Sequence, residues 1–353
     1  MRVAFVSMET THHRDTQGNR RLERVAGQLA ERGHDVEVYC ASSWDSEGST
    51  MSEDGVVYHG VVSDPSPRLF ALRLTTLLPG RGVDVIHASP RPPVAVAGAR
   101  VASALARAPL VVDWYGDEGL EESRWTSYAA TAPSCVVTPS EMVRTRVREY
   151  GTTADATRVI PEGIDVDILR DTEPDSDGPD VVYTHALDDS ANAESLLLAL
   201  AELRDHDWSA AIVGDGPERD RYERQAIDLR IDDRVQFLGE QSTEERVALY
   251  RGAHAFVQTA YECYFPTELL WALAAGCVGI VEYQAESSAH ELIENYARSF
   301  RVTNPQELAD AIVDAGQFGR QDYVSEFDRF DHDEILASYL DCYRDVQESH
   351  GLF

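Results

Sequence analysis

Two turns in the second half of the chain carry residues suited to binding an anion. The first follows an expected strand and consists of Gly214, Asp215, Gly216 and Pro217. The second contains Ser287 and Ser288 and precedes a helical segment with Glu291. A helix that begins directly after a small or glycine-rich turn directs free backbone N–H groups and its positive dipole end toward an anion. The two turns therefore predict a binding site for a diphosphate.

The charge of the chain narrows the classes of partner. Its 353 residues include 62 acidic and 31 basic side chains, which give a formal net charge of −31. Every basic residue is arginine, and the acids are spread along the whole length. Such a composition resembles proteins from the high-salt cytoplasm of halophiles, where a Debye length of about 3 Å at 1 M salt screens self-repulsion. The negative field disfavours binding to nucleic acid.

The cysteines and the apolar runs indicate the compartment. No C-x-x-C pair or histidine at zinc-ligand spacing accompanies the five cysteines, so we expect reduced thiols and no metal site. These cysteines are Cys40, Cys135, Cys263, Cys277 and Cys342. The longest apolar run, residues 269–281, is too short to span a membrane, and the apolar start is too short for a signal peptide. We expect a soluble, cytoplasmic protein.

Apolar strands alternate with helical stripes in both halves of the chain, which predicts doubly wound parallel sheets of the α/β class. Strands are expected near residues 2–7, 36–40, 56–62, 83–87, 110–113, 135–138, 181–185, 209–213, 234–238, 254–258 and 277–281. Helices are expected near residues 20–32, 68–79, 93–107, 140–150, 192–204, 217–229, 243–251, 266–275, 288–295 and 333–348.

The length and one polar segment predict two domains. A chain of 353 residues exceeds what one core usually serves. Residues 171–180 are polar and contain two prolines, as is typical of a linker. We therefore expect an N-terminal Rossmann-like domain over 1–170 and a C-terminal one over 171–330. The last helical segment, within 331–353, is expected to pack back toward the first domain.

Six short segments follow one another in a characteristic order along the chain. They are Glu31-Arg-Gly-His-Asp-Val, Val83-Asp-Val-Ile-His, Cys135-Val-Val-Thr-Pro-Ser-Glu, Val159-Ile-Pro-Glu-Gly-Ile-Asp, the Gly214 turn and Ala272-Leu-Ala-Ala-Gly. Each is a weak pattern alone, but their order resembles the family 4 glycosyltransferases (group 1) of the GT-B fold along nearly the whole chain. The resemblance implies two Rossmann-like domains that face a central cleft. It also implies retaining, metal-independent transfer of a hexose-like sugar, with a nucleotide-diphosphate sugar as co-substrate and no other cofactor.

The same resemblance implies a pair of glutamates in an E-x7-E pattern, one near the donor sugar and one on the nucleotide ribose. This chain has Cys263 and Trp271 at those positions. Glu262 lies one residue before the first and Glu268 three residues before the second, so we expect these two acids to take the catalytic roles. Alternatively, Glu262 is a surface acid and Glu268 is a helix-start carboxylate favoured by the dipole. Trp271 is expected to pack in the core.

The cations that neutralise the diphosphate in the family are also missing from their usual positions in this chain. The family has an arginine and a lysine after the first strand of the second domain, and His185 and Asn192 stand near those places. We expect His185 to line the donor site. Arg14 and Arg20, in the polar loop after the first strand of the chain, are expected to supply compensating charge, and Gly18 lets the backbone approach a phosphate.

The remaining candidates complete the expected site. Tyr115 takes the place of a family histidine that contacts the donor sugar, and its phenol suits a positioning role because it does not titrate near pH 7. Arg21 and Arg219 are additional candidate cations, for which solvated helix faces are the favoured interpretation. The serine pair before Glu291 is expected to cap that helix and to receive phosphate oxygens, while Glu291 matches a family glutamate.

The acceptor and the exact function stay open at this stage. Residues 68–81 alternate arginine with leucine, which indicates either a helix that packs on the sheet or a peripheral patch on the inner membrane face. The first hypothesis is a transferase acting on a glycan or lipid-linked acceptor in polysaccharide synthesis. The second is a non-catalytic relative that binds a glycan or a partner glycosyltransferase. A nucleotide-sugar epimerase is the third, and the order of the motifs disfavours it.

Overall fold

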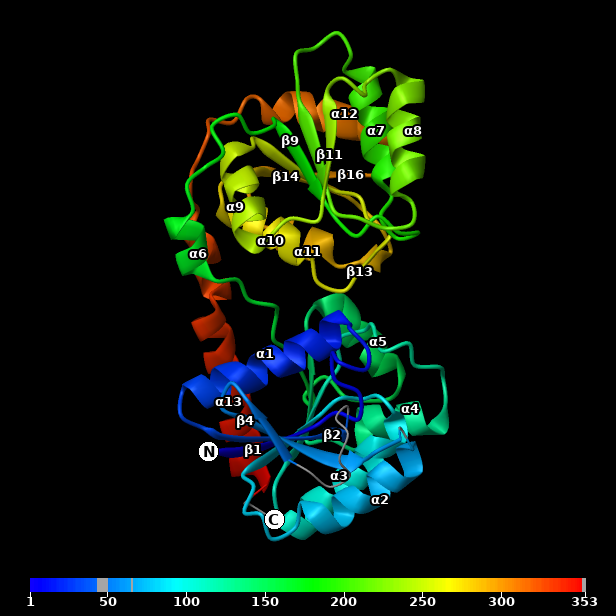
Figure 1. Cartoon of the computed structure of the whole chain (residues 1–353), viewed down its shortest axis with the longest axis vertical. Coiled ribbons are helices and arrows are strands. Elements are labelled where there is room, and N and C mark those ends of the chain that lie inside the picture. Colours follow the sequence, from blue (N-terminus) through cyan, green and yellow to red (C-terminus); the bar gives the residue numbers. More distant parts are fainter. Residues whose placement is uncertain (43–49, 65, 351–353) are drawn as a thin grey trace. The chain divides into compact units, whose positions relative to one another are not determined.

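The chain forms two compact units (Figure 1). The computed structural model describes residues 1–42, 50–64 and 66–350. Unit 1 consists of Met1–Pro161 and the C-terminal segment from Ile335 onward, and unit 2 consists of Glu162–Glu334. Each unit is built on a largely parallel sheet with helices between its strands. The predicted α/β class is confirmed.

Unit 1 contains an eight-stranded sheet with the strand order β3-β4-β2-β1-β5-β6-β7-β8. The strands are β1 Arg2–Val6, β2 Asp35–Ala41, β3 Thr50–Glu53, β4 Val56–Val62, β5 Val85–Ala88, β6 Leu110–Asp113, β7 Cys135–Thr138 and β8 Thr157–Val159. All neighbours are parallel except β3 and β4. The order reverses between β1 and β5, and ligands of doubly wound sheets bind at the carboxyl ends of the strands at such a point.

The helices of unit 1 bury apolar stripes against this sheet. They are α1 Gln17–Glu31, α2 Pro67–Leu77, α3 Pro93–Ala106, α4 Arg124–Thr131, α5 Glu141–Glu149 and most of α13 His332–His350. Thr16 caps α1, because its hydroxyl accepts the backbone N–H of Asn19 (3.3 Å). Helix α13 buries Leu336 and Tyr339 in the core of unit 1, so the end of the chain completes the first unit.

Unit 2 contains a six-stranded parallel sheet with the order β11-β10-β9-β12-β14-β16. Its strands are β9 Val181–Thr184, β10 Ala210–Val213, β11 Val235–Gly239, β12 Ala255–Gln258, β14 Val278–Glu282 and β16 Ser299–Val302. Two short strands, β13 Glu262–Cys263 and β15 Glu286–Ser287, pair separately. In this sheet the strand order reverses between β9 and β12. We therefore expect the ligand to bind at the carboxyl ends of β9 and β12.

The helices of unit 2 connect these strands in sequence. They are α6 Val166–Asp171, α7 Ala193–Glu202, α8 Arg219–Leu229, α9 Thr243–Gly252, α10 Thr267–Ala274, α11 Ala289–Ile293 and α12 Pro305–Ala315, followed by a 3₁₀ helix over Ser325–Phe330. Buried leucines of α7 pack in the core with apolar residues of β9, β10 and β12. Among the residues described above, no helix is both long and apolar enough to cross a membrane.

Three strands of the two large sheets, β3, β8 and β16, were not expected from the sequence. All three lie at sheet edges and have one neighbour each. An edge strand is covered on one side only, so it does not need the continuous apolar run by which interior parallel strands are recognised. The half-exposed residues of β16 and the polar residues of β3 show this directly.

Candidate functional site

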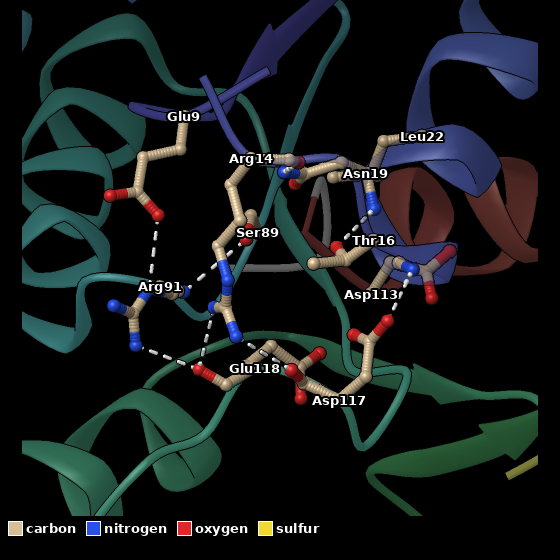
Figure 2. Close-up of a pocket in the computed structure, with 11 residues that line it drawn as sticks. Glu9, Arg14, Thr16, Asn19, Leu22, Ser89, Arg91, Asp113, Asp117 and Glu118 are labelled. Atoms are coloured by element: carbon tan, nitrogen blue, oxygen red, sulfur yellow. Dashed lines mark hydrogen bonds and ion pairs between the residues drawn. The ribbon is translucent and has the colours of Figure 1, made fainter. Parts of the chain in front are cut away.

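A pocket in unit 1 lies at the carboxyl edge of its sheet, beside the reversal between β1 and β5. Figure 2 shows its lining side chains, which come from segments after β1, β5 and β6 and from the start of α1. They include Glu9, Arg14, Asn19, Ser89, Arg91 and Asp117. Carboxylates accept and guanidinium groups donate, so the pocket presents both kinds of hydrogen-bonding group.

The segment after β6 is fixed by Glu118. Its buried carboxyl group accepts the backbone N–H groups of Tyr115 (2.7 Å) and Gly116 (2.9 Å). Its carbonyl oxygen accepts hydrogen bonds from Arg14 (3.1 Å) and Arg91 (2.8 Å). Burial, together with the neighbouring aspartate charge, raises the pKa of the Glu118 carboxyl to about 8. The hydrogen bonds to the Glu118 carbonyl hold the guanidinium groups of Arg14 and Arg91 at the pocket (Figure 2).

Gly18 and Asp117 meet at the same pocket. The Gly18 N–H donates to Asp117 Oδ2 (3.0 Å), and a Cβ at Gly18 would come within 2.8 Å of Asp117 Oδ1. Oδ1 is buried and has no hydrogen-bond partner among the described residues. Burial raises the pKa of this carboxyl. One acceptor atom of the pocket is therefore left for a ligand.

Two other candidates of unit 1, Tyr115 and Arg20, do not line the pocket. Tyr115 is buried, and its Cβ would lie 3.1 Å from a Cβ at Gly18, so it packs behind the glycine. Arg20 forms a two-pronged ion pair with Asp15 (2.6 Å for both contacts), in which each side chain is 55 % exposed. The structure thus groups Arg14, Gly18 and Tyr115 near the pocket and directs the Arg20 guanidinium to Asp15.

The interpretation of Arg21 as a residue on a solvated helix face is wrong. Its side chain is 1 % exposed and lies 3.1 Å from both oxygens of Asp113. It also donates to the Ile160 carbonyl (2.6 Å). The spacing contained the signal, because Arg21 precedes Val25 by one helical turn and falls on the buried stripe of α1.

Asp113 is the centre of a buried polar network in unit 1 that sequence reasoning missed. The Tyr339 hydroxyl of α13 donates to it, and His87 Nε2 lies 3.6 Å away. His87 Nδ1 is 2.6 Å from the Tyr343 hydroxyl. Burial opposes ionisation of Asp113, but the Arg21 charge and the hydrogen bonds lower its pKa to about 2.

In unit 2, the Gly214–Pro217 turn packs against the segment after β9. The Gly214 N–H donates to the Gly239 carbonyl (2.8 Å), and the Glu218 N–H donates to the Leu187 carbonyl (2.9 Å). Gly214 has φ +123°, and a Cβ there would overlap the His185 carbonyl oxygen. Only glycine fits this approach without strain. The predicted turn therefore lies beside the expected His185.

Two predicted residues of this turn are exposed, and the cation after it is partly buried. Asp215 and Pro217 face solvent, and Arg219 Nη1 lies 3.2 Å from Asp215 Oδ2. Arg219 also pairs with Glu223 (2.8 Å) and donates to the Phe237 carbonyl (3.2 Å). With its side chain 28 % exposed, Arg219 lies on a partly solvated face of α8 and bridges that helix to the end of β11.

Glu268 takes part in a network at the ligand edge of unit 2. Its Oε2 accepts from Arg246 Nε (3.1 Å) and from the Tyr250 hydroxyl (2.5 Å). The same hydroxyl lies 2.9 Å from Oγ1 of Thr184, the last residue of β9. Glu268 is therefore linked to the position where the strand order reverses. Arg246 was missed because α9 lies far from the turn motifs in sequence.

Glu262 lies apart from this network. It is exposed on β13 and accepts a hydrogen bond from the Tyr264 hydroxyl. Among the residues that the structure describes, no hydrogen bond joins Glu262 to Glu268. The two expected catalytic acids thus have different partners, Tyr264 for Glu262 and both Arg246 and Tyr250 for Glu268.

The serine pair is buried and differs from expectation. The Ser288 hydroxyl donates to the Tyr264 carbonyl (2.8 Å) and does not cap α11. The Ala289 N–H instead reaches the Ser287 hydroxyl (3.4 Å). Of the expected pair, Ser287 thus accepts the first backbone N–H of α11, whereas the Ser288 hydroxyl is engaged with a carbonyl and makes no cap hydrogen bond. Glu291 lies half-buried in the first turn of α11.

A further acid that the sequence did not single out closes the edge of the sheet. Glu282 ends β14 and is buried, and it accepts hydrogen bonds from Ser195 of α7 and from Gln284 (3.1 Å). Burial raises the pKa of this carboxyl. Asn192, at the start of α7, exchanges hydrogen bonds with Thr259 (3.0 and 2.7 Å). The Asn192 amide therefore serves the fold and offers no charge.

Two family profiles match the chain. The one described as Glycosyltransferase Family 4 matches residues 18–168, and the one described as Glycosyl transferases group 1 matches residues 167–316. Together they cover most of the sequence and both units. The chain belongs to the family 4 (group 1) glycosyltransferases. No curated protein sequence matches this glycosyltransferase significantly.

Solved structures agree with the GT-B fold of this glycosyltransferase. A glycosyltransferase from Rickettsia africae is 17 % identical with a TM-score of 0.79, over 98 % of each chain. Anabaena HepE, solved with UDP, is 19 % identical with a TM-score of 0.75, over 98 % of this chain and 100 % of the other. Sucrose-phosphate synthase from Thermosynechococcus elongatus is 17 % identical with a TM-score of 0.74, over 99 % and 100 %.

Cys263 and Trp271, which stand at the two positions where the family has glutamates, carry no carboxylate. Burial raises the pKa of the Cys263 thiol to about 12. Trp271 is buried on α10, in keeping with a core role. Any carboxylate chemistry on this side of unit 2 must therefore come from other residues, of which Glu268 is tied to the ligand edge.

Proposed function

We propose that this glycosyltransferase moves a sugar from a nucleotide-diphosphate sugar to a glycan or lipid-linked acceptor. The observation that carries the proposal is the Thr184–Tyr250–Glu268–Arg246 network at the strand reversal of unit 2. A carboxylate held by a guanidinium and a phenol has a fixed orientation, as a ribose-binding group requires. The UDP bound to Anabaena HepE supports a nucleotide donor.

The chemistry sets a demand for positive charge. Transfer breaks the bond between the anomeric carbon and the phosphate oxygen and joins that carbon to an acceptor oxygen, whose proton passes to the leaving diphosphate. Negative charge therefore grows on the diphosphate, where fixed cations stabilise it. In a chain without lysine these are arginines, and Arg219 and Arg246 both donate to carbonyls near the end of β11. We assign them to the diphosphate, with retention of configuration and no metal.

Unit 1 supplies the acceptor side of the proposal. Asp117 Oδ1 is a buried acceptor atom without a hydrogen-bond partner among the described residues, and Arg14 and Arg91 supply donors in the same pocket. A sugar hydroxyl can donate to the carboxylate and accept from a guanidinium at once. The pocket thus favours a hydroxyl-rich acceptor over an apolar one.

Nucleotide binding tests the donor assignment. Purified protein in molar KCl is expected to unfold at a higher temperature with one or more nucleoside diphosphates, because a ligand of the folded state stabilises it. Glu268→Gln keeps the hydrogen-bond acceptor but removes the charge, and it should weaken this shift. Glu244→Gln is the matched control, since Glu244 is exposed on α9. Unchanged nucleotide affinity in Glu268→Gln would refute the ribose role.

Sugar transfer is the second measurement. Glu268→Gln is expected to lower transfer more than Glu262→Gln, because only Glu268 is linked to the ligand edge. Release of the nucleoside diphosphate from its sugar, with and without glycan acceptors, reports this directly. Equal losses in both variants would contradict the assignment.

A non-catalytic relative that binds a glycan or partner is the alternative function. It is favoured by Cys263 and the buried Trp271 at the family's acid positions, neither of which carries a carboxylate. This alternative would be established if none of the nucleoside diphosphates raised the unfolding temperature while a glycan did. Epimerisation of a nucleotide sugar without an acceptor would establish the third possibility.

A further inference from the structure

Helices α2 and α3 of unit 1 present a surface that the pocket does not use. The large apolar side chains exposed on these two helices are Leu69, Leu72, Leu77, Val101 and Leu105. Leu72 and Leu105 are 64 % and 61 % exposed. Exposed arginines accompany them at positions 68, 73 and 107. These eight residues are called the α2–α3 face below.

The face is continuous across the two helices. Helices α2 and α3 lie side by side (Figure 1), and a Cβ at Gly98 of α3 would overlap the Ala71 backbone of α2. Leu72 adjoins this crossing point, and Val101 and Leu105 follow Gly98 by about one and two turns. The opposite side of α2 is buried, so packing on the sheet already uses a separate set of apolar residues.

The charge of this region is opposite to that of the protein. Of the 62 acidic residues in the chain, only Asp84 falls between Ser66 and Val112, a segment that holds six of the 31 arginines. Asp84 itself accepts the backbone N–H of Arg2 (2.7 Å) at the start of β1, on neither helix. The α2–α3 face is thus apolar and basic on a molecule with a net charge of −31.

We propose that the α2–α3 face docks unit 1 on a membrane surface that contains anionic lipid. Leucines can enter the boundary between headgroups and acyl chains while arginines meet lipid phosphates. Helix α4, which packs on α3, adds exposed Trp125 and Tyr128, residue types enriched at membrane interfaces. A second copy is a poorer occupant, because a symmetric dimer would place these arginines against each other. The proposal rests on the proposed function and deepens it, since it makes the acceptor lipid-linked.

Vesicle flotation of the full chain tests the apolar part. Vesicles of phosphatidylcholine alone and vesicles that also contain phosphatidylglycerol are compared at low salt and in molar KCl. The protein is expected to float with the anionic vesicles. Replacing Leu72 or Leu105 by serine should lower the partition coefficient by about tenfold each. Ile227→Ser is the matched control, because Ile227 is 58 % exposed on α8 of unit 2.

The charged part is tested in the same assay. Arg68→Gln and Arg107→Gln should each lower partition by about fivefold at low salt, and molar KCl should remove this difference. Arg224→Gln on α8 is the control and should float like the wild type. Circular dichroism of every variant separates loss of binding from loss of folding.

The outcomes separate this proposal from the proposed function. Absence of flotation with anionic vesicles at low salt overturns the membrane proposal, and so does equal flotation of the Leu72, Leu105 and wild-type proteins. A dimer that Leu72→Ser dissociates would show that a second copy covers the face instead. Nucleotide stabilisation measured on the same samples reports the donor site. Nucleotide stabilisation without flotation refutes only the membrane proposal. Flotation without nucleotide stabilisation refutes only the assignment of the donor site.

Discussion

Replacing Arg21 by methionine removes the positive charge at the centre of unit 1 while keeping much of the side-chain volume. Arg21 loses its contacts to both oxygens of Asp113 (3.1 Å) and to the Ile160 carbonyl (2.6 Å). Breaking a buried pair by removing one partner costs about 3–5 kcal/mol, because the remaining charge is buried without compensation. The neighbouring pair of Arg20 and Asp15 is exposed, and such pairs contribute roughly 0.2–1 kcal/mol. Arg20→Met is therefore a control one residue away.

Thermal unfolding followed by circular dichroism provides the measurement. For unit 1 we expect Arg21→Met to lower the midpoint by roughly 10 °C and Arg20→Met by no more than about 3 °C. Added KCl should remove the Arg20 difference and leave the Arg21 deficit, because buried pairs are screened much less. Arg21→Met combined with Asp113→Asn should recover part of the loss, since no unpaired carboxylate is then buried.

The pH dependence follows from the same contact. The folded pKa of Asp113 is about 2 and the ordinary value is 3.8. Its contribution to stability is therefore fully present above the ordinary value and is lost as pH falls toward the folded one. The difference between wild type and Arg21→Met should shrink over that interval. If Arg21→Met is no less stable than Arg20→Met at neutral pH, the reasoning about the buried pair is refuted.

Two further predictions concern the two ligand edges. Gly214→Ala should lower the midpoint of unit 2 by several degrees, because its Cβ would overlap the His185 carbonyl, whereas Gly27→Ala in α1 meets open space and should stabilise by about 0.5–1 kcal/mol. The raised pKa of Glu118, about 8 against an ordinary 4.5, means that the folded state holds the proton more tightly. Stability should therefore fall as pH rises through that interval, and urea titrations should show a flatter profile for Glu118→Gln.

The sequence predicted the interior of the fold well and its edges poorly. Buried parallel strands such as β1 and β14 are apolar runs that need no tertiary context to be recognised. Edge strands such as β3 are specified by one neighbour and are mainly polar. Helix α10, expected over residues 266–275, forms over Thr267–Ala274.

The candidate site was predicted in part. The Gly214 turn and the close approach at Gly18 both require glycine, because a Cβ at either position would meet neighbouring atoms. Their positions could therefore be predicted from the sequence. Arg246 could not be identified in this way, because its partner Glu268 on α10 is brought to it by the packing of α9 against α10. Arg21 was misassigned because its charge was weighed above its position on the buried stripe.

The sequence by itself determined the α/β class, the family and the positions of the glycine turns. These properties are local, since apolar periodicity and backbone conformations open only to glycine act over a few residues. Tertiary structure alone decided which charges are satisfied. Arg21, Asp113, Tyr339 and Glu268 have partners distant in the chain, and each partner fixes whether a charge stabilises the core or stands at a ligand edge. Burial and partners arise only when separate segments pack together, so composition cannot reveal them.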